Sequence, residues 1–401
     1  MPKPLALART AGESFSPNRV RQRLNHRQYS PATLTKAVST AVAARSFQDA
    51  AKLLQINTDL IISPRHLQNL AREVGDELIQ EQSKKTEAFR ARRLNTPHKQ
   101  AEPPIPLAVV MIDGGRIQTR KPGSGPGVHD AAWRETKTAI LLRMTHEPSA
   151  LDPRPDLPEC FRHPLGTPAT TTDCPPSDAP EHVPKTLFRT GLASLKDSDD
   201  FGFQVAGQAE DRGFHSAKHG AFVGDGLAYN WTIHRRHFSS FTPILDFVHA
   251  SEHLHAAARA IHQSGERWTT LCWQGRTSEV IQEIAAERDL LTPPADPKTD
   301  PDHPWCVLDR EHGYMDNNRE RMNYPEYRRD GLPITSSPME SWVKMVNQRV
   351  KGSEKFWNND GHAEAILHLR SAWLGDEDVL ANHLASRPGH PYARPKTRMV
   401  A

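Results

Sequence analysis

Three acidic residues have the surroundings that a phosphoryl-transfer site needs. Asp113 and Asp225 each follow a short apolar run and stand beside glycine, in VVMIDGGR and GDGLAYNW, and Glu340 opens a later helix. In an open α/β sheet, the strand ends border the crevice where ligands bind. Mg²⁺ takes oxygen ligands, and two such ions stabilise the entering and leaving oxygens of an in-line phosphoryl displacement. Each acid also has an ordinary structural role, in a glycine turn or at a helix start.

A second motif uses histidines. HASEH spells His-x-x-Glu-His, in which His249 and His253 share a helix face with Glu252 as a possible base. Glu320 or Glu326 is a candidate third zinc ligand. Because the motif is short and the chain has 21 His, a zinc protease is kept as the lesser alternative.

Apolar runs predict the strands that position the acids. LAVVMI (107–112) predicts a buried central strand that ends in a tight turn at Asp113-Gly114-Gly115. TAILLRM, AFV and TPIL predict further strands, and the last of them ends at Asp246. Helical patterns occupy the stretch before residue 218 and then 228–237, 247–290 and 305–322. Strands followed by helices indicate an α/β core.

The helix that carries Glu340 is predicted to be amphipathic. Its apolar stripe consists of Met339, Val343, Val346 and Val350. Glu340, Lys344, Asn347 and Lys351 share the other face. A carboxylate followed by lysines suits a metal bound beside a phosphate backbone.

The first 100 residues are basic, with 17 Lys and Arg against 8 Asp and Glu. The spacing of apolar residues predicts a helix over 31–44, a second helix capped by Ser46 and a third that begins at Ser63-Pro64. Polar residues off the stripe of the third helix suit a helix-turn-helix that reads the DNA major groove, namely Arg65, His66, Gln68, Asn69 and Arg72. A plain three-helix bundle with a solvated face is the alternative.

Composition excludes some classes of protein. No apolar run approaches the roughly 18 residues of a membrane span. Four scattered cysteines in 401 residues do not make a disulfide scaffold, and they indicate a reduced, cytoplasmic protein. Ten of the 33 prolines fall within 145–185, which predicts a long irregular loop.

From Asp113 to about residue 374, the sequence resembles the Mutator-like DDE transposases of bacterial insertion sequences (Kra-type group). The matching stretches, in the order of that family, are VVMIDGGR, GDGLAYNW, ILDFVHASEHLHAAARAI, NNRERMNYPEYRRDGLPI, PMES and NQRVKGSEKFW. The resemblance implies that Asp113, Asp225 and Glu340 are the catalytic metal ligands. It matches the Asp-x-x-His element of the family to Asp246 and His249, as residues that support the site. Ser336-Ser337-Pro338 stands where relatives have Gly-Ser-Gly.

The resemblance also implies a fold. It predicts a ribonuclease-H-like mixed sheet core with an all-helical insertion, behind an N-terminal helical DNA-binding region. The expected boundaries are 1–100 for the DNA-binding region, 101–250 and 335–380 for the two parts of the core, 251–334 for the insertion and 381–401 for a basic disordered tail.

The implied activity is metal-dependent cleavage of the ends of a mobile element, followed by strand transfer into target DNA. Two Mg²⁺ ions, replaceable by Mn²⁺, are the expected cofactors, and Lys344, Arg349 and Lys351 are expected to contact DNA. The expected partners are terminal inverted repeats, target DNA and a second copy of the chain in a homodimer or larger assembly, with no membrane. The expected location is the nucleoid of the bacterial cytoplasm. The altered Gly-Ser-Gly segment keeps open a DNA-binding protein that derives from a transposase and is no longer catalytic.

Overall fold

The computed structural model describes residues 29–92, 100–120, 132–163, 183–352 and 355–387. The chain forms two compact units. One comprises Met1–Glu81, Gln118–Ala132 and Val346–Ala401, and the other comprises Gln82–Ile117 and Trp133–Met345. The last helices of the chain therefore belong with the first ones, which differs from the predicted boundaries at 100, 335 and 380.

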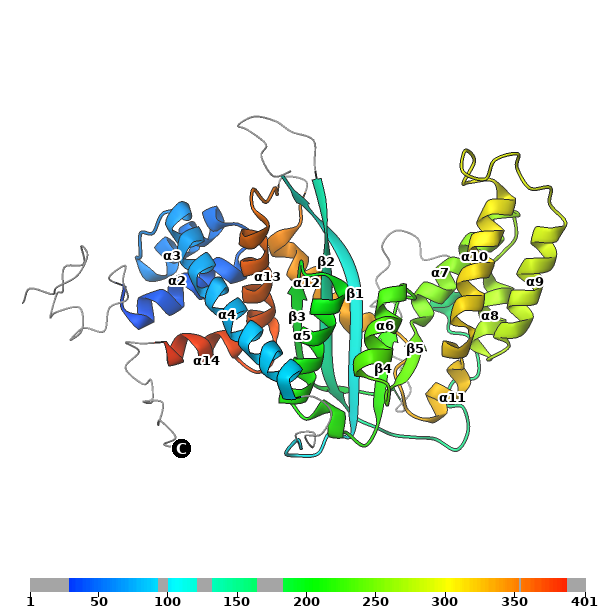
Figure 1. The fold of residues 1–401 in the computed structure, drawn as a ribbon, viewed down its shortest axis with the longest axis horizontal. Helices are drawn as coiled ribbons and strands as arrows, with labels where there is room; N and C mark the ends of the chain where they lie inside the picture. The colour runs from blue at the N-terminus through cyan, green and yellow to red at the C-terminus, as the bar shows by residue number, and fades with distance from the viewer. Residues whose placement is uncertain (1–28, 93–99, 121–131, 164–182, 353–354, 388–401) are drawn as a thin grey trace, which may run out of the picture. The chain divides into compact units, whose positions relative to one another are not determined.

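The second unit contains a five-stranded mixed sheet in the order β3-β2-β1-β4-β5 (Figure 1). The strands are β1 (Leu107–Thr119), β2 (Ala132–Met144), β3 (Thr186–Ser194), β4 (Gly220–Gly224) and β5 (Thr242–Leu245). β2 and β3 are antiparallel, whereas β4 is parallel to β1 and β5 is parallel to β4. The α/β class predicted from the sequence is confirmed at this level.

Strand β1 corrects the prediction of a turn at Asp113. The run LAVVMI is buried at the centre of the sheet as expected, but the strand continues through Gly114 and Gly115 to Thr119. The two glycines allow close approach rather than a turn. A Cβ on Gly115 would lie 2.8 Å from Oγ1 of Thr136 on β2, and a Cβ on Gly114 would lie 3.1 Å from the hydroxyl of Tyr229.

Strand β3 lies in a segment that was predicted to be helical. It pairs with β2 from Lys137↔Ser194 to Met144↔Thr186. Gly191 removes a side chain where the strand meets a neighbour, because a Cβ there would lie 2.6 Å from the main-chain oxygen of Ala139. Helix α5 (Ser198–Asp211) begins only afterwards, with Asp197 as its N-cap.

The region after β4 is helical, as predicted. Helix α6 (Ala228–His237) lies between β4 and β5 in the chain. After β5 come α7 (Phe247–Ala260), α8 (Glu266–Trp273), α9 (Thr277–Asp289), α10 (Pro304–Asn318) and α11 (Tyr324–Arg329). Helices α8, α9 and α10 lie side by side, and α7 packs against α10 (Figure 1). Helix α12 (Ser337–Val350) follows and returns the chain to the sheet.

Helix α12 buries Met339, Trp342, Val346 and Val350. Trp342 therefore takes the place in the apolar stripe that the sequence assigned to Val343, which is only half-buried. The indole is fully buried, and a Cβ on Gly191 would lie 2.9 Å from its ring. Strand β3 and helix α12 are thus in direct contact through Trp342.

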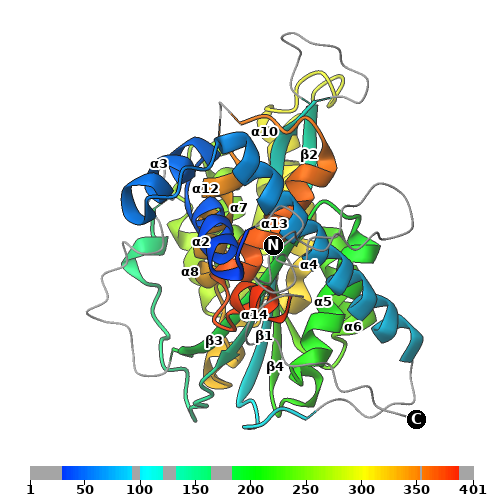
Figure 2. The ribbon, with the colours of Figure 1, turned by 90° about the vertical axis from the view of Figure 1, so that its left-hand side faces the viewer.

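The described residues of the first unit are mainly helical, apart from the ends of β1 and β2 and a short β contact between Thr119 and Trp357. The helices α2 (Pro31–Ala43), α3 (Phe47–Thr58) and α4 (Pro64–Arg92) confirm the three predicted helices, although α4 is longer than expected. Ser46 and Ser63 cap α3 and α4 through the main-chain N–H groups of Asp49 and His66. Helices α13 (Asp360–Leu374) and α14 (Val379–Ser386) pack against α2 (Figure 2).

Helix α14 corrects the prediction of a disordered tail from residue 381. His383 pairs with Glu77 at 2.8 Å, and Arg387 reaches Glu73 at 2.9 Å and Glu77 at 2.7 Å. Glu73 and Glu77 on α4 therefore hold α14 in place through ion pairs with His383 and Arg387. Residues 388–401, and 164–182 of the proline-rich loop, lie outside the described residues.

Two further sequence predictions are addressed by the described residues. None of their helices combines the length and the hydrophobicity that a membrane span requires. Cys272 and Cys306 have free thiols, whereas Cys160 is disulfide-bonded, so the prediction that the cysteines are reduced is wrong for Cys160.

Candidate functional site

Three aspartates form a row across three parallel strands, directly after the ends of β4 and β5 and within β1. The register pairs Ile112 with Gly224, and Gly224 with Leu245. Asp113, Asp225 and Asp246 each come one residue later, so they occupy equivalent positions on β1, β4 and β5. Because neighbouring strands lie about 4.8 Å apart, the sheet places three carboxylates next to one another. The sequence indicated the apolar run before each aspartate separately, and the parallel register brings the three aspartates together.

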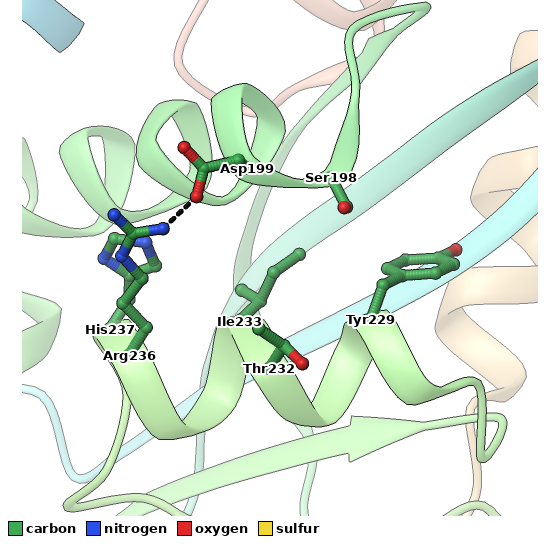
Figure 3. Close-up of a pocket in the computed structure, with 7 residues that line it drawn as sticks. All are labelled: Ser198, Asp199, Tyr229, Thr232, Ile233, Arg236 and His237. Atoms are coloured by element: carbon green, nitrogen blue, oxygen red, sulfur yellow. Dashed lines mark hydrogen bonds and ion pairs between the residues drawn. The ribbon is translucent and has the colours of Figure 1, made fainter.

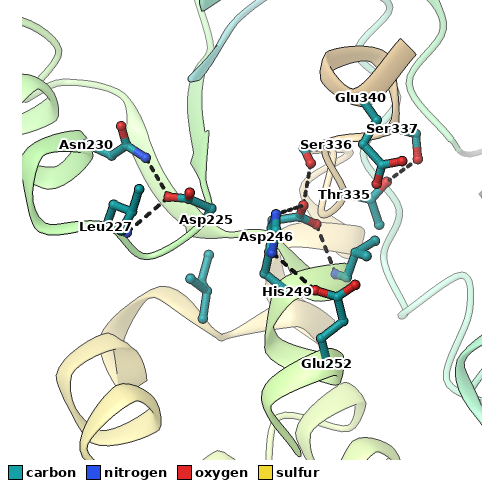
Figure 4. Close-up of polar contacts among 12 residues, drawn as sticks. Asp225, Leu227, Asn230, Asp246, His249, Glu252, Thr335, Ser336, Ser337 and Glu340 are labelled. Carbon is teal, nitrogen blue, oxygen red and sulfur yellow. Dashed lines mark hydrogen bonds and ion pairs between the residues drawn. The ribbon is translucent and has the colours of Figure 1, made fainter. Parts of the chain in front are cut away.

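Asp225 is oriented by contacts on several sides. Its Oδ1 accepts hydrogen bonds from the main-chain N–H of Leu227 at 3.0 Å and from Nδ2 of Asn230 at 2.7 Å. Asn230 is fully buried in α6, which fixes the donor. The main-chain oxygen of Asp225 accepts a hydrogen bond from the hydroxyl of Tyr314 at 2.8 Å. The carboxylate therefore has a defined orientation at the end of β4 (Figure 4).

Asp113 experiences the negative charge of this row. Burial and the adjacent charge of Asp225 raise the pKa of Asp113 to about 6, and Asp246 adds to the shift. His249 and a main-chain hydrogen bond from Gly114 act in the opposite direction but do not cancel it. The negative charges of Asp113 and Asp225 therefore repel each other, and His249 offsets this repulsion only in part.

Asp246 differs from the other two aspartates because it is the N-cap of α7 and is fully buried. Its Oδ1 accepts from the main-chain N–H of Val248 at 3.0 Å, and its Oδ2 accepts from the hydroxyl of Ser336. Both carboxylate oxygens are therefore engaged by the protein. Burial raises the pKa of Asp246 even so. This geometry fits a residue that supports the site, the role that the resemblance implies for it.

The contact between Ser336 and Asp246 predicts a stability effect. We expect Ser336→Ala to lower the free energy of unfolding by about 1–3 kcal/mol, because it leaves a buried carboxylate oxygen without a donor. Ser337→Ala is the matched control. Among the residues that the structure describes, its hydroxyl makes only a 3.4 Å contact with Thr335, and we expect a loss within about 0.5 kcal/mol. Urea unfolding of the two variants measures the difference, and equal losses would contradict this role for Ser336.

Glu340 lies at the first turn of α12, on the far side of Asp246 from Asp225 in the view of Figure 4. Burial raises the pKa of Glu340, and the charge of Asp246 adds to this, whereas Lys344 lowers it. Lys344 lies 3.7 Å from the Glu340 carboxylate. The structure thus brings Glu340 next to Asp246, while Lys344 pairs with Glu340 rather than standing apart as a phosphate contact.

His249 lies between Asp246 and Glu252. Its Nε2 is 3.9 Å from Oδ2 of Asp246, and its Nδ1 is 3.5 Å from Glu252. Burial disfavours the charged ring, but Glu252, Asp246 and Asp225 together raise the pKa of His249 to about 9. The imidazolium is therefore the stable form at neutral pH. It places one positive charge beside the aspartate row.

The donor chemistry of the row fits a hard divalent cation, because Asp113 and Asp225 are adjacent carboxylates whose negative charges repel each other. Within the described residues, however, no three His, Cys, Asp or Glu side chains are arranged to hold a metal ion. Asp113 and Asp225 thus form the fitting pair. Glu340, which pairs with Lys344, does not complete a three-ligand set in this conformation.

The histidines of HASEH do not form a zinc site in the described part of the chain. His253 pairs with the buried carboxylate of Glu311 and stacks on Tyr314, with ring centroids 3.5 Å apart. Glu326, one candidate third ligand, is bonded to Asn323. The structure thus gives His253 a role in packing α7 against α10.

The residues predicted to bind DNA fall into different environments. Of the set on α4, Arg65 and Arg72 are exposed, and His66, Gln68 and Asn69 are half-buried. Lys351 is exposed at the end of α12. Among these residues, the exposed side chains are therefore those of Arg65, Arg72 and Lys351.

The prediction that Arg349 contacts DNA is wrong. It is buried at 4% exposure, and its guanidinium lies 4.1 Å from the ring centre of Phe47. Its Nε donates to the main-chain oxygen of Ala41 at 3.2 Å. Arg349 therefore holds the end of α12 to α2 and α3 and does not present its charge to DNA.

A pocket that the sequence did not indicate lies between the start of α5 and α6 (Figure 3). It is lined by Ser198, Asp199, Tyr229, Thr232, Ile233, Arg236 and His237. Arg236 and Asp199 pair at one end, and Tyr229 lies at the other. The hydroxyl of Tyr229 is buried without a hydrogen-bond partner among the described residues. It lies close to Gly114, so this pocket adjoins the strand that carries Asp113.

Comparison with known proteins assigns no family to this chain. No protein-family model matches the chain, and no curated protein matches it significantly.

Proposed function

We propose that this chain is a DNA transposase of the DDE type, which cuts the ends of a mobile element and joins them to target DNA. The observation that carries the proposal is the row of Asp113, Asp225 and Asp246 at equivalent positions on three parallel strands. The family resemblance, which runs through the same residues, gives the row its expected chemistry.

The fold supports the proposal in two ways. The mixed sheet places Asp225 and Asp246 directly after the carboxyl ends of β4 and β5, with Asp113 beside them within β1. The carboxyl ends of strands are where α/β sheets bind ligands. Helices α7 to α11 separate β5 from α12 in the chain. This arrangement is what a ribonuclease-H-like core with a helical insertion requires, and we propose that identity for the second unit.

The roles of the residues follow from their surroundings. Asp113, Asp225 and Glu340 would hold Mg²⁺, which when bound supplies charge neutralisation and an acidified water. The hydrogen bonds from Leu227 and Asn230 hold the Asp225 carboxylate in one orientation, so little reorganisation is needed at the moment of reaction. Asp246 and Ser336 join the start of α7 to the start of α12. We propose that this link keeps Glu340 close to the aspartate row.

We further propose that the accessible polar face of α4 and Lys351 bind the DNA of the element ends, and that two copies of the chain act together. Basic residues at the start of an exposed helix suit a recognition helix. Binding through phosphate contacts falls steeply with salt, which gives a separate test of this part.

The direct test uses labelled duplexes taken from the DNA on either side of the gene, incubated with the full chain and Mg²⁺ or Mn²⁺. We expect cleavage at a fixed position and joining of the released 3′ hydroxyl to a plasmid. Specific binding without cleavage by either metal would favour the non-catalytic DNA-binding alternative. If the chain neither binds nor cleaves these duplexes, the proposal is overturned.

A further inference from the structure

Tyr314 on α10 reaches from the helical segment to the main chain of Asp225. Its hydroxyl donates to the main-chain oxygen of Asp225 at 2.8 Å, across 89 positions of sequence. The aromatic ring also supports the next residue. Gly226 has a φ of +93°, and a Cβ there would lie 2.7 Å from the Tyr314 ring. The turn after β4 therefore rests directly on Tyr314.

Tyr314 is itself held in place from behind. The ring of His253 on α7 stacks on it with centroids 3.5 Å apart and planes 19° apart. His253 pairs with Glu311, which is 2% exposed and also accepts from Nε of Arg310 at 2.9 Å. The Tyr314 ring is thus enclosed by the Asp225–Gly226 turn on one side and by the half-buried His253, paired with Glu311, on the other.

We propose that Tyr314 is a positioning residue for Asp225, through which α7 and α10 fix the carboxylate in the aspartate row. The main-chain oxygen of Asp225 is held by Tyr314, and its carboxylate by Leu227 and Asn230. Releasing the main chain frees the residue to rotate away from Asp113. The effect on metal binding and cleavage rests on the proposed function, whereas the effect on the loop does not.

The test compares Tyr314→Phe with Tyr327→Phe in the full chain. Tyr327 is a matched control, because its hydroxyl also donates to a main-chain oxygen, that of Pro243 at 3.4 Å, at the opposite end of β5 from Asp246. In the metal-free protein, we expect Tyr314→Phe to speed amide exchange over 225–227 about tenfold. That is the loss of about one hydrogen bond.

Two further measurements follow metal binding and DNA cleavage. We expect Tyr314→Phe to weaken Mn²⁺ binding, followed by electron paramagnetic resonance, about tenfold. It should lower kcat for cleavage of the flanking duplex by a similar factor, with KM unchanged. Tyr327→Phe should leave all three quantities within about twofold.

The outcomes separate the inference from the proposed function. If the wild type binds Mn²⁺ and cuts DNA but Tyr314→Phe behaves like the wild type, the positioning role is overturned and the function stands. If the two variants speed amide exchange over 225–227 equally, the effect comes from a general loss of stability, and the positioning role is also overturned. If the wild type neither binds Mn²⁺ nor cuts, the proposed function fails, and amide exchange still decides whether Tyr314 fixes the turn.

Discussion

Asp113→Asn is expected to abolish metal-dependent cleavage while making the metal-free protein more stable at neutral pH. The loss of activity should be on the order of 10³-fold or more, because a metal-binding carboxylate becomes a neutral amide. The stability gain has a different origin. Burial and the charge of Asp225 disfavour ionised Asp113 in the folded state, and asparagine carries no charge.

The pH dependence of this gain follows from the direction of the pKa shift. The folded pKa of Asp113 is about 6, above the usual 3.8. The folded state of the wild type is therefore more stable relative to the unfolded state when Asp113 is protonated. Its free energy of unfolding falls as the pH rises from about 4 to 6. A shift of about two units corresponds to at most about 3 kcal/mol. Since Asp113 is partly exposed, we expect a gain of about 1–3 kcal/mol above pH 7 that disappears near pH 4.

Thermal unfolding in a chelator, from pH 4 to pH 8, measures this difference. Asp302→Asn is the control, because Asp302 is exposed in the loop before α10, and neither stability nor cleavage should change. A metal-free Asp113→Asn variant that is less stable than the wild type at pH 8 would mean that Asp113 has a structural role.

Trp342→Ala is expected to cost about 3–5 kcal/mol of stability, the largest loss for a single side chain near the site. The indole is fully buried, packs where Gly191 leaves space on β3, and lies 5.3 Å from the guanidinium of Arg189. Because Glu340 lies two residues earlier on the same helix, we also expect cleavage to fall at least tenfold in the protein that remains folded.

The control for this prediction is Trp133→Ala, since Trp133 on β2 is 51% exposed. It should cost less than about 1 kcal/mol and leave cleavage unchanged. Denaturant unfolding at 25 °C gives both stabilities, and cleavage is assayed well below the unfolding transition. A Trp342→Ala variant with near wild-type stability would contradict the packing of α12 on β3.

Features governed by local chemistry were predictable from the sequence. The caps at Ser46 and Ser63 depend on contacts three residues away, and both occur. The apolar run before Asp113 and the short runs before Asp225 and Asp246 became strands of one sheet. The row of aspartates could be predicted only in part, because the sequence shows the apolar runs before the aspartates but not the register of the strands.

The remaining features depend on partners far along the chain. Gly114 and Gly115 resemble a turn in sequence, yet they continue β1 beside Thr136 and Tyr229. Arg349 resembles an exposed basic residue, yet it is buried against α2, about 300 positions earlier. Tyr314 showed no local signal, because its importance comes from the main chain of Asp225.

We expect Asp113 and Asp225 to bind a divalent cation together with Glu340. Anomalous diffraction from crystals of the full chain grown with Mn²⁺ would locate this ion. We expect a strong peak between the carboxylates of Asp113 and Asp225, with Glu340 drawn toward it, and no such peak in Asp225→Asn crystals. An empty aspartate row at saturating Mn²⁺, or a peak at His253 and Glu311 instead, would contradict the account.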